Sequence, residues 1–131
     1  MEIATKGYER VEVITIKGRV DSVAAPQLAQ ALEAAHHRSR YRIVVDMSEL
    51  EYMSSAGFRA LGDAQRTLKR HNRGEVILAQ VPNNIRDALE IVGFAEYFTM
   101  IDTVASALEF AANLPADHSS QSGADAPASP A

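Results

Sequence analysis

The chain has 131 residues, 47% of them hydrophobic, which is enough to build one folded core and does not call for a second domain. It contains no cysteine, so disulfide bonds and thiolate metal sites are excluded and a reducing compartment is favoured. The net charge of −4 disfavours nucleic acid as a partner, because an acidic surface repels phosphate backbones.

Apolar β-rich runs alternate with amphipathic helical segments along the chain. The expected strands are a short one near Ile3 and four others at residues 11–16, 41–47, 75–80 and 98–101. The expected helices are four, at residues 21–37, 55–71, 82–92 and 103–111. This alternation predicts an α/β fold with a mostly parallel sheet of four to five strands and about four helices.

Capping and stop residues set the expected boundaries of these elements. Gly18 is expected to form a turn, and Asp21 or Ser22 to cap the first helix. The later boundaries are expected at Asn72 with Gly74, at Pro82-Asn83, at Gly93, and at Asp102 or Thr103. The run at 41–47 has consecutive apolar residues at 43–45 and no regular alternation, so we expect that strand to be buried on both faces.

The ordered domain is expected to span residues 1–113. Residues 114–131 are rich in Ala, Ser, Asp, Gly and Pro, and they have no large apolar side chain after Leu114. Such a segment cannot offset the entropy of ordering, so we expect a disordered acidic tail. All 13 Lys and Arg residues lie in residues 1–86, whereas residues 87–131 carry 7 acidic residues and no Lys or Arg.

The sequence offers little support for a membrane or nucleic acid partner. No apolar stretch approaches the roughly 20 residues that cross a bilayer, and the N-terminus lacks the pattern of a signal peptide. We therefore expect a cytoplasmic protein. One basic group, made of Arg66, Lys69, Arg70 and Arg73, falls near the end of an expected helix. Cations at that position ordinarily complement the helix dipole in solvent, so the group is interpreted as solvated surface.

Signals for the common catalytic chemistries are missing or incomplete. Neither the phosphate loop G-x-x-x-x-G-K-[ST] nor G-x-G-x-x-G is present. The four histidines have no metal-ligand spacing; they are His36, His37, His71 and His118. Ser55 has Met53 where a nucleophile elbow needs glycine, and no histidine follows it in the order of a hydrolase triad within the ordered domain after His71. We therefore expect no metal, no cofactor and no enzymatic activity.

The pentad Met53-Ser54-Ser55-Ala56-Gly57 stands where a buried strand is expected to give way to a helix. The first turn of a helix has unpaired N–H groups and a partial positive charge, so it suits a phosphate carried by a serine. A phosphate there would change the charge of a contact surface without unfolding the domain. The structural alternative is that Ser54 and Ser55 only cap the helix.

Residues 43–61, which contain this pentad, resemble the hallmark segment of STAS domains, the family of bacterial anti-sigma factor antagonists. Three further stretches are similar to family motifs, and these are residues 18–22, Pro82-Asn83 and residues 91–94. The resemblance extends from residue 3 to about residue 112. It implies a STAS fold and a regulatory protein that acts in transcription and stress response.

The resemblance also implies partners and a switch. The domain would bind a serine-kinase anti-sigma factor, which uses ATP to phosphorylate Ser55, with Ser54 as the alternative. A phosphatase of the PP2C type would reverse the modification, so that the unphosphorylated protein binds its partner and the phosphorylated protein is released. The implied contact surface consists of Asp21, Ser22, Met53, Ser54, Ser55, Ala56, Gly57 and Arg59. We expect a monomer or weak dimer.

This chain departs from the family pattern at three positions around the proposed phosphorylation site. Ser54 replaces the usual aspartate, and Ala56 replaces a frequent second serine. Arg59 replaces a small residue, and it could hold the phosphate or contact an acidic partner. Gly57 is expected to let a partner's backbone approach closely.

Two other functions are compatible with the same fold. One is a scaffold or stressosome-like subunit in which phosphorylation regulates assembly. The other is a small-ligand or lipid-binding module, which would have an apolar pocket at the strand ends.

Overall fold

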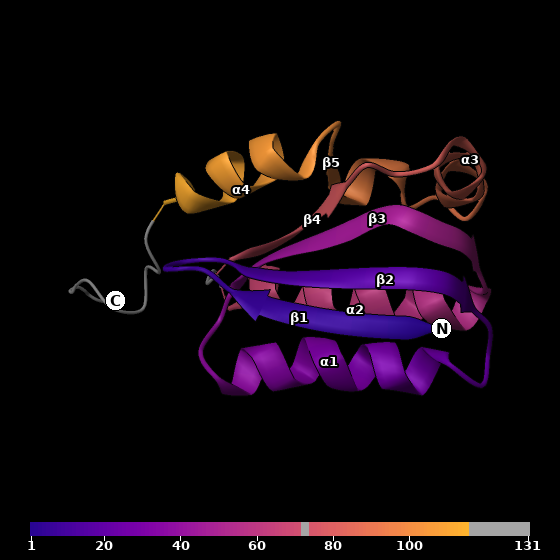
Figure 1. Ribbon diagram of the computed structural model, residues 1–131, viewed down its shortest axis with the longest axis horizontal. Helices are drawn as coiled ribbons and strands as arrows, with labels where there is room; N and C mark the ends of the chain where they lie inside the picture. The colour runs from indigo at the N-terminus through magenta and orange to yellow at the C-terminus, as the bar shows by residue number, and fades with distance from the viewer. Residues whose placement is uncertain (72–73, 116–131) are drawn as a thin grey trace.

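Five strands form one sheet in which only the first pair is antiparallel. The computed structural model describes residues 1–71 and 74–115. The strands lie side by side in chain order, and they are β1 (Glu2–Gly7), β2 (Glu12–Val20), β3 (Arg42–Met53), β4 (Glu75–Ala79) and β5 (Thr99–Ile101) (Figure 1). Strand β1 pairs antiparallel with β2, and the three remaining pairs are parallel. The predicted mostly parallel sheet is therefore confirmed.

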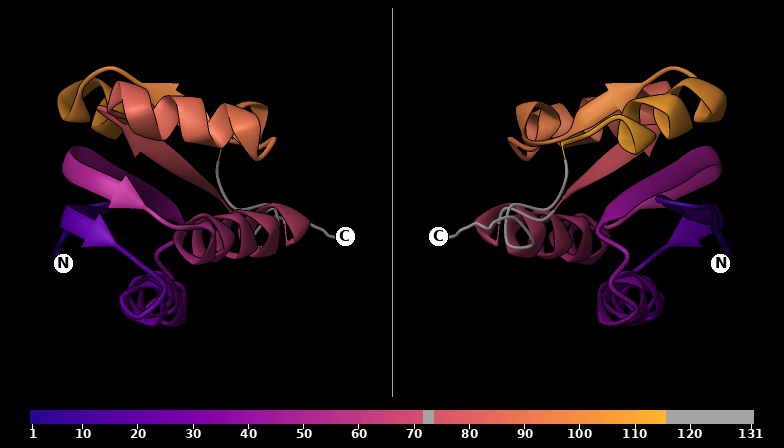
Figure 2. Two further views of the ribbon diagram at one scale, coloured as in Figure 1. Left: turned by 90° about the vertical axis from the view of Figure 1, so that its right-hand side faces the viewer. Right: turned by 90° about the vertical axis from the view of Figure 1, so that its left-hand side faces the viewer.

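Helices cover both faces of this sheet. They are α1 (Ala25–His37), α2 (Ser55–Arg70), α3 (Asn83–Ile91), the short 3₁₀ helix η1 (Ala95–Tyr97) and α4 (Val104–Ala112). Helices α1 and α2 lie on one side of the sheet and α4 on the other, as Figures 1 and 2 show. No helix of the described segments is long and apolar enough to cross a membrane.

Alternate residues of the central strands point into two separate cores. Ile43, Val45 and Leu78 belong to the larger core, which α1, α2 and α3 complete. Val44 and Ile77 belong to the smaller core, which α4 closes. All five side chains are at most 1% exposed. Burial on both faces explains why residues 43–45 of the predicted strand at 41–47 are apolar without alternation.

The expected turn at Gly18 is wrong, because β2 continues through this residue to Val20. Gly18 has φ +89° and lies beside an irregularity in the pairing of β2 with β3. Glycine tolerates that backbone conformation, so the strand bends here instead of ending. The predicted end of the third strand at Met47 is also wrong. Strand β3 continues to Met53 and pairs there with the second half of β2.

The ends of most helices agree with the predictions. Thr103 caps α4, its side chain accepting a hydrogen bond from the N–H of Ser106 at 3.0 Å. Gly93 has φ +82° just after α3, as a helix stop requires. The cap of α1 is a correction, because Ala24 occupies the N-cap position without a side-chain bond. Asn72, Arg73, His118 and most of the expected tail, residues 116–131, lie outside the described residues.

Candidate functional site

The candidate site lies where β2 and β3 end next to each other. Val20 and Met53, the last residues of these strands, are paired in the sheet. The N–H of Ser54 donates to the carbonyl oxygen of Val20 at 2.8 Å, which continues the pairing by one residue. Parallel strands end at the same edge of a sheet, so the loop that begins at Asp21 and the start of α2 form neighbouring surfaces.

Ser54 and Ser55 have different roles, which the sequence left open. Ser54 has extended backbone angles, and its hydroxyl oxygen accepts a long 3.4 Å hydrogen bond from the N–H of Gly57, so Ser54 is the N-cap of α2. Ser55 is the first residue of the helix and is exposed. Within the described part of the chain, the Ser55 hydroxyl has no hydrogen-bond partner. Ser55 is therefore the serine whose oxygen is accessible and uncommitted.

Met53 and Gly57 are buried, so neither residue presents surface to a partner. A Cβ atom at position 57 would lie 2.6 Å from Cγ of Met53 and 3.0 Å from Cγ1 of Val20. The small size of Gly57 thus serves the packing of α2 against the ends of β2 and β3. This corrects the expectation that Gly57 allows close approach of a partner's backbone.

Asp21 organises the neighbouring loop instead of capping α1 directly. Its Oδ1 accepts hydrogen bonds from the N–H groups of Val23 at 3.1 Å and Ala24 at 2.8 Å. Ser22 is exposed, and Val23 is 86% exposed. A large apolar side chain held in solvent by an ordered loop is suited to contact with another protein. The sequence prediction included Asp21 and Ser22 but missed Val23.

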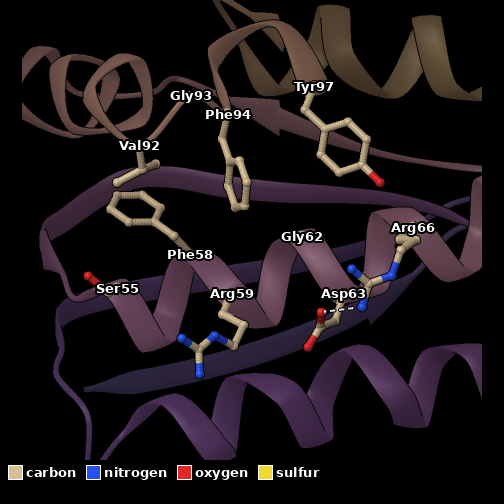
Figure 3. Close-up of a pocket in the computed structure, with 10 residues that line it drawn as sticks. All are labelled: Ser55, Phe58, Arg59, Gly62, Asp63, Arg66, Val92, Gly93, Phe94 and Tyr97. Carbon is tan, nitrogen blue, oxygen red and sulfur yellow. Dashed lines mark hydrogen bonds and ion pairs between the residues drawn. The ribbon is translucent and has the colours of Figure 1, made fainter.

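A hollow of about 670 Å³ opens beside Ser55, between α2 and the segment that follows α3. Figure 3 shows its lining, which consists of Ser55, Phe58, Arg59, Gly62, Asp63, Arg66, Val92, Gly93, Phe94 and Tyr97. Phe94 packs against Gly62 so closely that a Cβ atom there would lie 3.0 Å from the ring. Val92 leaves 44% of its surface exposed at the hollow. The hollow therefore combines apolar walls with charged residues along α2.

Gln65 links α2 to Tyr97 on the opposite wall of the hollow and to strand β4. It is fully buried on α2, and its Nε2 donates to the carbonyl oxygen of Tyr97 at 2.9 Å. Its Oε1 accepts from the N–H of Val76 at 2.7 Å. Strand β5 pairs with β4 only from Ile77 onward, so Gln65 satisfies a backbone group just before the ladder begins. The sequence prediction missed this residue, since a polar side chain on an amphipathic helix is ordinarily solvated.

Comparison of the chain with known proteins identifies the class of protein that has this arrangement of sheet, capped helix and exposed serine. The model of the STAS domain family matches residues 2–107, so the chain belongs to this family. The protein BtrV of Bordetella bronchiseptica, assigned as an anti-sigma factor antagonist, is 30% identical over 116 residues, covering 88% of this chain and 99% of BtrV.

Two solved structures of one anti-sigma factor antagonist, SpoIIAA, have the same fold. Its unphosphorylated form has a TM-score of 0.75 at 20% identity, covering 87% of this chain and 99% of that chain. The phosphorylated form of SpoIIAA from Bacillus has a TM-score of 0.68 at 21% identity, covering 83% and 98%. The family resemblance and the STAS fold are thereby confirmed.

Proposed function

We propose that this protein is an anti-sigma factor antagonist that binds a serine-kinase anti-sigma factor and is released when Ser55 is phosphorylated. The observation that carries the proposal is the exposed Ser55 hydroxyl at the first position of α2, next to a separate cap residue, Ser54. Two features of the family support it. The similarity to BtrV extends over most of the chain. SpoIIAA, which shares the fold, has both an unphosphorylated and a phosphorylated form.

The contact surface proposed for the unphosphorylated protein is formed by the β2–α1 loop and the start of α2. Ser22, Val23 and Ser55 are its exposed members, and Asp21 holds the loop in shape. The anti-sigma factor would cover this surface and in doing so release its sigma factor. Because Ser55 lies within the surface, the binding partner has direct access to the residue that it modifies.

The proposed modification transfers the γ-phosphoryl group of ATP to the Ser55 hydroxyl. The Oγ–P bond forms, the bond to ADP breaks, and the hydroxyl proton passes to solvent or to a base of the kinase. In the described part of the chain, no group accepts a hydrogen bond from the N–H of Ser55 or Ala56. These N–H groups and the helix dipole would stabilise the added charge. Release follows because about −1.5 to −2 charges enter a surface that was complementary to the partner.

Phosphorylation tests the assignment of Ser55. The protein is incubated with candidate anti-sigma kinases and ATP, and the modified peptide is identified by mass spectrometry. We expect incorporation in the wild type and in Ser54→Ala but not in Ser55→Ala. Incorporation that survives both substitutions would remove the serine pair from the mechanism.

A binding assay tests whether negative charge at position 55 weakens partner binding, without requiring phosphoryl transfer. The kinase that modifies the protein is immobilised, and capture of three forms is compared. Ser55→Ala adds no charge and should be captured like the wild type, whereas Ser55→Asp adds a negative charge and should be captured more weakly. Equal capture of both variants would contradict the electrostatic account. A PP2C-type phosphatase added to the phosphorylated protein should restore capture.

A further inference from the structure

We propose that Arg59 is the residue through which the phosphate acts: it pairs with a carboxylate of the partner in the unphosphorylated state and with the phosphate on Ser55 after modification. This inference rests on the proposed function of Ser55. It assigns a role to one exposed side chain of α2.

Three charged side chains line the hollow beside Ser55, and they are spaced along the same face of α2. Arg59, Asp63 and Arg66 follow one another at intervals of four and three residues (Figure 3). Residues at such intervals are neighbours on a helix surface. The only acid of the three therefore has an arginine on each side.

Asp63 pairs with Arg66, and this leaves Arg59 available. The Asp63 Oδ1 and Arg66 Nη2 atoms are 2.7 Å apart. Among the described residues, no ion pair or hydrogen bond involves the Arg59 side chain, which is exposed. Among the described residues that line the hollow, Arg59 thus carries one uncompensated positive charge, and the lining also includes Val92, which is 44% exposed. A partner segment that fits this hollow would present an apolar side chain and a carboxylate.

Ser55 precedes Arg59 by four residues, the spacing at which an acid and a base on a helix attract each other best. Adding a phosphate to Ser55 would extend the row to phosphate, Arg59, Asp63 and Arg66, with alternating charge signs. An arginine can bind phosphate through two parallel hydrogen bonds. The tethered phosphate would then compete with the partner's carboxylate for the same guanidinium group.

Two separate assays test the proposal: one measures the second pKa of the phosphate on Ser55, and the other measures capture by the partner. Phosphoserine is incorporated at position 55 by site-specific encoding, so that no kinase is needed, and the ³¹P chemical shift is titrated with pH. We expect Arg59 to lower the second pKa of the phosphate, normally about 6, by a few tenths of a unit relative to the Arg59→Ala variant. Arg70→Ala is the charge-matched control, since Arg70 is exposed on the same helix but about 22 Å along its axis from Ser55. Equal pKa values in wild type and Arg59→Ala would overturn the proposal.

Capture by the anti-sigma kinase tests the second half of the proposal. Arg59→Ala should weaken capture of the unmodified protein by about two- to fivefold, the size expected for losing one solvent-exposed ion pair. In the Arg59→Ala background, Ser55→Asp should weaken capture less than it does in the wild type. Independent, multiplicative effects of the two substitutions would refute competition for Arg59. An absence of capture, or of any Ser55→Asp effect in wild type, would instead refute the proposed function, and the ³¹P result would still stand.

Discussion

The buried amide of Gln65 allows the sharpest test of how the fold supports the hollow. Replacing it with methionine keeps a long unbranched side chain of similar size but removes both hydrogen-bonding groups. The N–H of Val76 and the carbonyl oxygen of Tyr97 then lose their partners. Val76 is fully buried, whereas Tyr97 is only partly buried, so water can reach the second group more easily than the first.

The magnitude follows from those two lost bonds. A buried polar group left unpaired costs about 1–3 kcal/mol. The Val76 group should fall near the upper end of that range and the Tyr97 group near the lower end. Burying an apolar side chain in place of an amide offsets part of the loss, so we expect Gln65→Met to lower the free energy of unfolding by about 2–3 kcal/mol.

Urea unfolding followed by circular dichroism at 222 nm measures this change. Arg70→Met on the exposed face of α2 is the matched control, and it should change stability by less than about 0.5 kcal/mol. A Gln65→Met variant that unfolds at the same urea concentration as the control, with an unchanged slope, would show that the two hydrogen bonds of Gln65 do not stabilise the fold.

Three further predictions concern residues outside the hollow. Ser54→Ala removes the cap of α2 and should cost about 1 kcal/mol in urea unfolding, and a cost near zero would show that the 3.4 Å bond contributes nothing. Gly57→Ala should lower stability by about 1–3 kcal/mol, because the added methyl group displaces Met53; a crystal structure with Met53 unmoved would contradict this explanation. Glu12→Gln removes a carboxylate that is buried beside Arg38, at 2.6 Å, and a second arginine. It should lower the melting temperature by an amount that corresponds to about 2 kcal/mol, whereas the exposed Glu49→Gln variant, whose partner is Lys17, should change little.

Local sequence patterns were sufficient to predict the α/β class, the alternation of strands and helices, and the start of α2. These features depend on neighbouring residues. The continuous apolar run at 43–45 requires burial on both faces, and the stop at Gly93 requires a backbone conformation that glycine favours. The place of Ser54 and Ser55 at a strand-to-helix junction also follows from the sequence, whereas the structure decides that Ser55 is the exposed serine.

Tertiary contacts decided the remaining features, because they join residues that are distant in the sequence. Polar residues at 48–49 and 51–52 read as a loop, yet they extend β3 because the second half of β2 is available for pairing. Gln65 is buried because a backbone N–H of β4 and a carbonyl after α3 converge on it. Spacing along the helix allows Asp63 to pair with either Arg59 or Arg66, because these residues lie four and three positions away from it. The side-chain geometry of the folded protein decides that Asp63 pairs with Arg66, which, among the described residues, leaves Arg59 unpaired beside Ser55.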